Sequence, residues 1–100
     1  MLVVAGTVKV KPETRAEALQ AAIRMAKATQ AEPGCRSYGF YADVADPNTI
    51  LIFEQWESEA ALLAHFQTPH MAEFNAAIPR FLAAPPSINR YDVGAVVKLV

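Results

Sequence analysis

The chain has 100 residues, the length of a single domain, and we treat residues 1–100 as one domain. Its net charge of −1 and pI near 6.1, without a basic stripe, argue against a nucleic-acid partner, and no apolar run approaches the roughly 18 residues of a membrane span. Cys35 is the only cysteine, which excludes an internal disulfide and a cysteine-based zinc site and favours a reducing, cytoplasmic location.

The first half of the chain predicts a strand, a helix and a second strand. Residues 2–10 are rich in β-branched side chains, as strands are, and Pro12 suits the first turn of the helix that follows. Residues 32–34, Glu-Pro-Gly, end this helix and turn the chain. Residues 35–44 then form the second strand. The apolar face of the helix is expected to consist of Ala18, Leu19, Ala22, Ile23 and Ala26.

The second half predicts a strand, two helical segments and a last strand. Residues 49–57 are the strongest strand in the sequence and pair with the preceding strand across the turn at residues 46–48. Ser58 and Thr68 are helix caps, the second of them followed by a proline, and Pro79 kinks or shortens the second helical segment. The last strand spans residues 88–97, with Gly94 as a candidate bulge.

The element order β-α-β-β-α-β predicts an α+β fold of the ferredoxin-like type, a four-stranded antiparallel sheet with helices on one face. The other face is apolar too, because Leu51 and Phe53 alternate with Ile50 and Ile52. A composition of 53% apolar residues is high for so small a domain, and part of the apolar surface is expected to meet a partner. We therefore expect a homodimer that covers this second face.

The middle of the chain resembles the antibiotic biosynthesis monooxygenase domain family, small dimeric α/β-barrel proteins that include quinol monooxygenases. The residues that carry the resemblance are Glu32-Pro33-Gly34-Cys35, Tyr38, Asp46-Pro47, Phe53-Glu54-Gln55-Trp56-Glu57-Ser58, and Leu62, His65, Thr68, His70 and Phe74 at their spacing. The resemblance implies oxygenation of a small, electron-rich aromatic or quinol substrate without metal or flavin. Haem-degrading relatives use an Asn and a His where Thr7 and Asn75 stand here, so a haem cofactor is not expected.

The candidate site is a pocket between the sheet and the helices. Glu54 and Trp56 share one face of their strand, so the carboxylate is either a base in the pocket or a structural group bonded to the backbone. His70 lies in a first helical turn, whose dipole favours a neutral imidazole that can accept a phenolic proton, and His65 either faces the pocket or packs structurally. The predicted catalytic residues are His70, His65 and Glu54. The predicted substrate-binding residues are Trp56, Phe74, Tyr38 and Phe66.

Two alternatives to a cofactor-independent monooxygenase remain open. One is a non-catalytic module, of a binding or stress-response type, that shelters a hydrophobic molecule, and the other is an isomerase of small carbonyl compounds that uses the same histidines and Glu54. No metal is expected, because His65 and His70 are the only histidines and lie five residues apart across a helix break, unlike the i, i+4 pair of a helical metal site.

Overall fold

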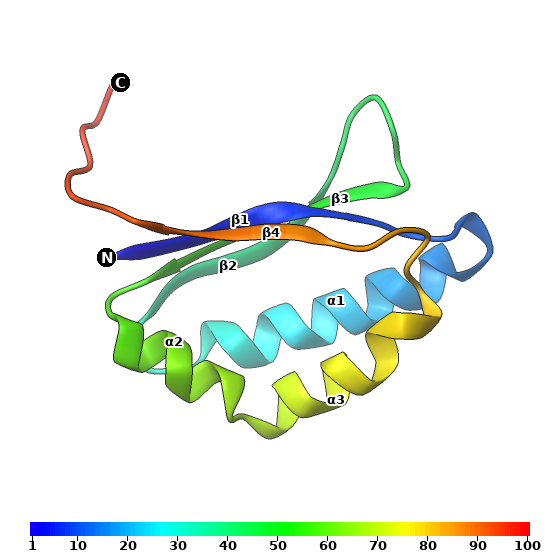
Figure 1. Cartoon of the computed structure of the whole chain (residues 1–100), viewed down its shortest axis with the longest axis horizontal. Helices are drawn as coiled ribbons and strands as arrows, with labels where there is room; N and C mark the ends of the chain where they lie inside the picture. Colours follow the sequence, from blue (N-terminus) through cyan, green and yellow to red (C-terminus); the bar gives the residue numbers. More distant parts are fainter.

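The computed structural model describes residues 1–100 and contains four strands, three α-helices and two short 3₁₀ turns (Figure 1). The elements in chain order are β1 (Leu2–Lys9), the 3₁₀ turn η1 (Pro12–Thr14), α1 (Arg15–Gln30), β2 (Cys35–Ala42), β3 (Thr49–Trp56), α2 (Glu59–Phe66), α3 (Pro69–Ala77), the 3₁₀ turn η2 (Ile78–Arg80) and β4 (Ser87–Asp92). No helix is both long and apolar enough to cross a membrane.

The four strands form one antiparallel sheet in the order β2-β3-β1-β4. All the helices lie against the same face of this sheet, and no helix covers the other face, on whose side the loop between β2 and β3 and the C-terminal segment project (Figure 1). This arrangement confirms the predicted ferredoxin-like α+β fold. In the register of the sheet, Glu54 of β3 lies opposite Val4 of β1 and Tyr38 of β2, so all three side chains share the helix-covered face.

The predicted caps and turns form as expected. The hydroxyl of Ser58 accepts a hydrogen bond from the Ala61 N–H at 3.2 Å, and the hydroxyl of Thr68 accepts one from the Met71 N–H at 3.2 Å. Gly34 has φ = +82°, a backbone conformation that side-chain-bearing residues rarely adopt, so the turn after α1 depends on glycine. These two caps and this turn fix where the helices that carry the site begin and end.

Two predicted features of the elements are wrong in detail. The buried face of α1 consists of Ala18, Ala21, Ala22, Met25 and Thr29, whereas Ile23 is 48% exposed. Alanines surround this helix on most sides, so the apolar pattern did not define its inner face. The last strand ends at Asp92 and not near residue 97, because Asp92 already lies opposite Leu2, the first residue of β1, and no strand remains to pair with.

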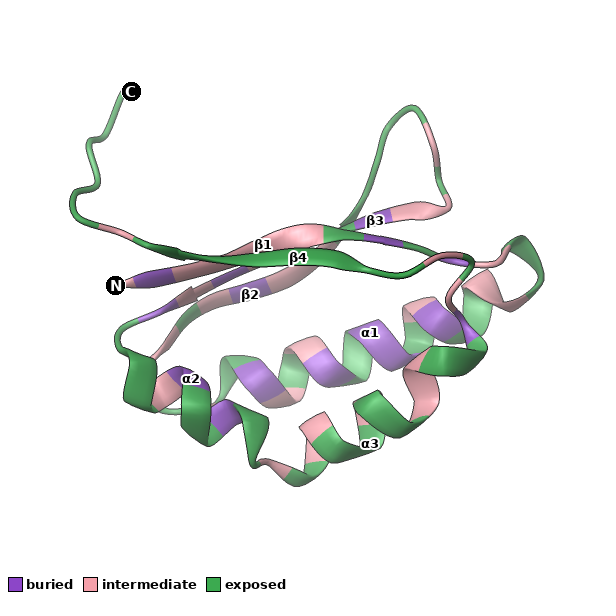
Figure 2. Ribbon diagram, in the orientation of Figure 1, coloured by how far each residue is buried: buried purple, intermediate pink, exposed green.

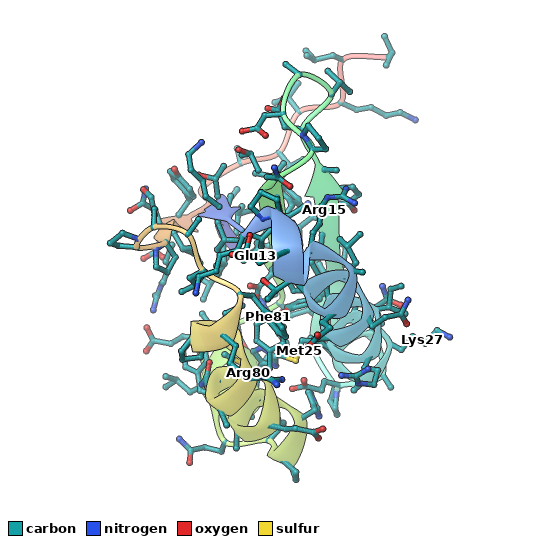
Figure 3. All side chains as sticks on the ribbon, turned by 90° about the vertical axis from the view of Figure 1, so that its right-hand side faces the viewer. Glu13, Arg15, Met25, Lys27, Arg80 and Phe81 are labelled. Carbon is teal, nitrogen blue, oxygen red and sulfur yellow. The ribbon has the colours of Figure 1, made fainter.

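Two groups of buried side chains form the core between the sheet and the helices. One lies toward η1 and contains Val8, Val10, Ala18, Ala21, Ile50, Ile52 and Phe81. The other contains Leu2, Met25, Tyr38, Trp56 and Leu62. Figure 2 shows buried residues along the side of α1 that faces the sheet, while β4 is exposed throughout. In Figure 3, Met25 and Phe81 lie between the layers and Lys27 extends away from them.

Candidate functional site

Glu54 and Trp56 lie side by side under the helices, at the end of β3. Trp56 is fully buried and Glu54 is 7% exposed. The indole Nε1–H of Trp56 donates a hydrogen bond of 2.9 Å to Oε1 of Glu54. Burial raises the pKa of Glu54 to about 7, because the hydrogen bond from Trp56 offsets only part of the lost solvation and the charge of Glu32 adds to the shift. The predicted shared face is confirmed, and the carboxyl is poised to change its charge near neutral pH.

His65 of α2 packs on the aromatic side chains of this core. Its ring lies 4.8 Å from that of Trp56 and 5.7 Å from that of Tyr38, measured between ring centroids, and its side chain is 1% exposed. Burial, followed by the nearby charge of Glu54, raises the pKa of the Tyr38 hydroxyl well above its ordinary value, so Tyr38 stays a neutral phenol. His65 is therefore a core residue by burial, with aromatic rings on two sides.

Glu32 brings the two histidines together. Its Oε2 atom lies 2.7 Å from Nδ1 of His65 and 2.6 Å from Nε2 of His70. A carboxylate only accepts hydrogen bonds, so both ring nitrogens donate to it. Glu32 comes from the turn after α1, His65 from α2 and His70 from the first turn of α3, so the three groups join three segments of the chain. Two imidazole nitrogens and a carboxylate oxygen are also a donor set that divalent metal ions accept.

A cavity of about 210 Å³ opens between α1 and α3, next to this cluster. From α1 it is lined by Ala21, Arg24, Met25 and Ala28, and from α3 by His70, Glu73, Phe74 and Ala77. His70, with 24% of its side chain exposed, is the member of the cluster that lines the cavity. The site therefore combines a mostly apolar wall with a histidine that a buried carboxylate holds in place.

The structure divides the predicted site residues between the cavity and the core. His70 and Phe74 line the cavity, whereas Glu54, Trp56 and His65 lie deeper, with Met25 packed both on the core and along the cavity wall. The remaining two residues differ in exposure, since Tyr38 is buried and Phe66 is 49% exposed at the end of α2. A pocket directly between sheet and helices stays a prediction.

Sequence reasoning missed Glu32 and Arg24. The sequence places Glu32 in the turn after α1 and in the motif of the family resemblance but gives it no role in a site, and it gives Arg24 none. One observation could have drawn attention to Glu32: it carries a negative charge just beyond the C-terminal end of a helix, where the helix dipole disfavours it. A carboxylate placed against that preference needs a partner elsewhere, and the two histidines supply it.

The chain matches known proteins over most of its length. The family model described as "Antibiotic biosynthesis monooxygenase" matches residues 1–77. An uncharacterized protein of Synechocystis, sll1783, is 42% identical over 92 residues, which are 92% of this chain and 63% of that protein. The "Putative monooxygenase YcnE" of Bacillus subtilis is 34% identical over 93% of this chain and 98% of its own length. The "Probable quinol monooxygenase YgiN" of Escherichia coli is 42% identical over 55 residues, 47% of this chain and 53% of that protein.

Solved structures show the same fold. The crystal structure of a "putative antibiotic biosynthesis monooxygenase" from Deinococcus radiodurans superposes with a TM-score of 0.93 at 26% identity. That superposition covers 100% of this chain and 99% of the Deinococcus chain. A conserved protein from Methanosarcina mazei superposes with a TM-score of 0.86 at 28% identity, over 90% of this chain and 89% of the other.

Proposed function

The chain belongs to the antibiotic biosynthesis monooxygenase family, and from that premise we propose that it oxidises a small aromatic substrate, a quinol, in the cavity between α1 and α3. The observation that carries the proposal is His70, which lines this cavity while Glu32 holds its Nε2 at 2.6 Å. The name of the Escherichia coli relative supports the choice of a quinol. The free thiol of Cys35 supports a cytoplasmic location.

The geometry supports His70 as the proton acceptor of the proposed reaction. Because Nε2 donates to Glu32, the neutral ring has its lone pair on Nδ1, for which the structure contains no hydrogen-bond partner. A phenolic hydroxyl bound in the cavity transfers its proton to Nδ1. The carboxylate of Glu32 then stabilises the imidazolium that forms, as a carboxylate does for the histidine of a catalytic triad.

The rest of the cavity suits the anion that results. Phe74, Met25 and the alanines give an aromatic ring an apolar wall. Arg24 lines the cavity together with Glu73, and we assign its guanidinium to the negative charge of a phenolate. A quinolate is electron-rich enough to reduce oxygen itself. In the overall reaction, a quinol and O₂ give a hydroxylated quinone and water. One oxygen atom enters the ring and the other leaves as water, and the quinol supplies all four electrons.

Oxygen uptake tests this function. The protein is incubated with a panel of hydroquinones, with ¹⁸O₂ in place of O₂ and catalase to exclude peroxide as the oxidant. We expect enzyme-dependent uptake with at least one hydroquinone and a quinone product that carries one ¹⁸O atom. If no hydroquinone is consumed faster than in buffer alone, the monooxygenase proposal fails. Binding of the same hydroquinones without turnover would instead favour the non-catalytic binding module.

A further inference from the structure

The cluster of Glu32, His65 and His70 brings three potential metal-ligand atoms close together. The chain contains two histidines, and both point at the same carboxylate oxygen. One ligand atom from each of the three residues lies within 4.8 Å of the other two. The cluster is largely closed to solvent on the side of His65, which is 1% exposed, and open on the side of His70, which is 24% exposed.

We propose that Glu32, His65 and His70 form a binding site for one divalent transition-metal ion such as Zn²⁺, with a coordination position open toward the cavity between α1 and α3. Two neutral imidazoles and one carboxylate are a ligand set that Zn²⁺ and its first-row neighbours accept, and three protein ligands with a free fourth position are common for zinc outside purely structural sites. The sequence predicted no metal because it has one cysteine and two histidines at an unsuitable spacing, whereas the fold brings Glu32 to both histidines as the third ligand.

The side chains of the site must rearrange to accept the ion. Ligand atoms around a tetrahedral zinc lie roughly 3.3 Å apart, given metal–ligand bonds of about 2.0–2.1 Å. The nitrogen–oxygen separations of 2.6 and 2.7 Å are hydrogen bonds, so they must open by roughly 0.6–0.7 Å, while the two histidine nitrogens, which lie within 4.8 Å of one another, must approach by up to about 1.5 Å. His70 is the partly exposed member, in the first turn of α3, so we expect its side chain to make most of this movement.

The ion and the hydrogen bonds use the same atoms, so they exclude one another. A neutral imidazole carries one proton. A metal on Nε2 of His70 therefore moves that proton to Nδ1, and a metal on Nδ1 of His65 moves its proton to Nε2. Once His70 carries its proton on Nδ1, it can no longer accept one from a phenol in the cavity. This consequence rests on the proposed function: bound Zn²⁺ should inhibit quinol oxidation.

Metal binding is measured first without any enzyme assay. Protein without a histidine tag, treated with EDTA and dialysed, is titrated with Co²⁺, whose visible absorption reports its ligands, and with Zn²⁺ in a calorimeter. We expect one equivalent of each ion to bind, and binding to weaken at least tenfold in His70→Ala and Glu32→Gln. Glu13→Gln, an exposed carboxylate in η1, and Cys35→Ser, the only thiol, are the controls and should bind as the wild type does.

Several outcomes overturn the proposal. It fails if neither ion binds at a one-to-one ratio, if His70→Ala and Glu32→Gln bind as tightly as the wild type, or if Cys35→Ser abolishes binding. Circular dichroism of each variant separates loss of the site from loss of the fold. If the ions bind but leave quinol oxidation unchanged, then bound metal does not prevent His70 from accepting a proton, and that part of the inference is wrong. A protein that binds Co²⁺ but oxidises no quinol keeps the metal site and loses the proposed function.

Discussion

The carboxylate of Glu32 and the imidazole of His65 lie 2.7 Å apart, although 33 residues separate them in the chain. The bond ties the turn after α1 to the end of α2, and the same oxygen atom also holds His70 at the start of α3. Because Glu32 is 11% exposed and His65 is 1% exposed, solvent screens this contact poorly. Glu32 therefore connects the buried core, through His65, to the cavity, through His70.

Replacing Glu32 with glutamine should impair both folding and activity. The amide keeps the shape of the side chain but removes its negative charge, so two charge-assisted hydrogen bonds become neutral ones. We expect a loss of about 1–3 kcal/mol in the free energy of unfolding and at least a ~10-fold loss of kcat on quinols. Urea unfolding and oxygen uptake measure the two effects. Glu13→Gln, on an exposed carboxylate, should change neither, and a Glu32→Gln variant indistinguishable from this control would contradict the prediction.

Removing the imidazole of His70 should lower turnover much more than stability. If Nδ1 of His70 accepts the phenolic proton, His70→Ala should reduce kcat by about 10²-fold. The side chain is 24% exposed and the helix start is capped by Thr68, so α3 should still form. Steady-state kinetics, corrected for the folded fraction seen by circular dichroism, test this directly. Wild-type turnover in the folded variant would remove His70 from the mechanism.

The buried carboxyl of Glu54 should make the folded state less stable as the pH rises. Its pKa rises from an ordinary value of 4.5 to about 7 in the folded protein, so the folded chain keeps a proton that the unfolded chain has lost. The stability that this proton provides is present below about pH 4.5 and is lost as the pH rises through about 7. The shift corresponds to a loss of up to about 3 kcal/mol across this window.

Glu54→Gln isolates this effect from the other titrating groups. The variant has no proton to lose at this position, so the difference in unfolding free energy between wild type and variant should change across the window in favour of the variant. Urea unfolding at several values between about pH 4.5 and 8 gives this difference at each pH. A difference that stays flat with pH would mean that Glu54 ionises in the folded protein as it does in the unfolded chain.

Local chemistry decided which parts of the fold could be predicted. The caps at Ser58 and Thr68 and the turn at Gly34 depend on the residues themselves and their near neighbours, and all three were predicted correctly. The end of β4 was not, because it depends on where β1 begins, 90 residues away in the chain. The same limit applies to the site: the spacing of His65 and His70 is local, but the contact of both with Glu32 exists only once α1, α2 and α3 have packed.

The face of the sheet that no helix covers is where we expect a second copy of the chain. The pairing register places Val3, Ala5, Leu51 and Phe53 on this face, together with Tyr41 and Tyr91 of the outer strands. Leu51 is 39% exposed, Tyr41 55% and Tyr91 52%. Large apolar side chains gathered on one exposed face favour a partner, and we expect a second copy of the chain to cover them with the same face of its own sheet.

A single charge on that face should separate the subunits. Leu51 lies on β3, an inner strand, flanked by Thr7 and Tyr41 on the neighbouring strands, so a lysine there would place a charge within the expected interface. We expect sedimentation at micromolar concentration to give twice the 10.9 kDa chain mass for the wild type and the chain mass for Leu51→Lys. Ile23→Lys is the matched control: Ile23 is an equally large side chain, 48% exposed on α1, in the helical layer on the opposite side of the sheet, and its variant should stay dimeric. A wild type that sediments only as the 10.9 kDa species would leave the apolar face without the partner proposed for it.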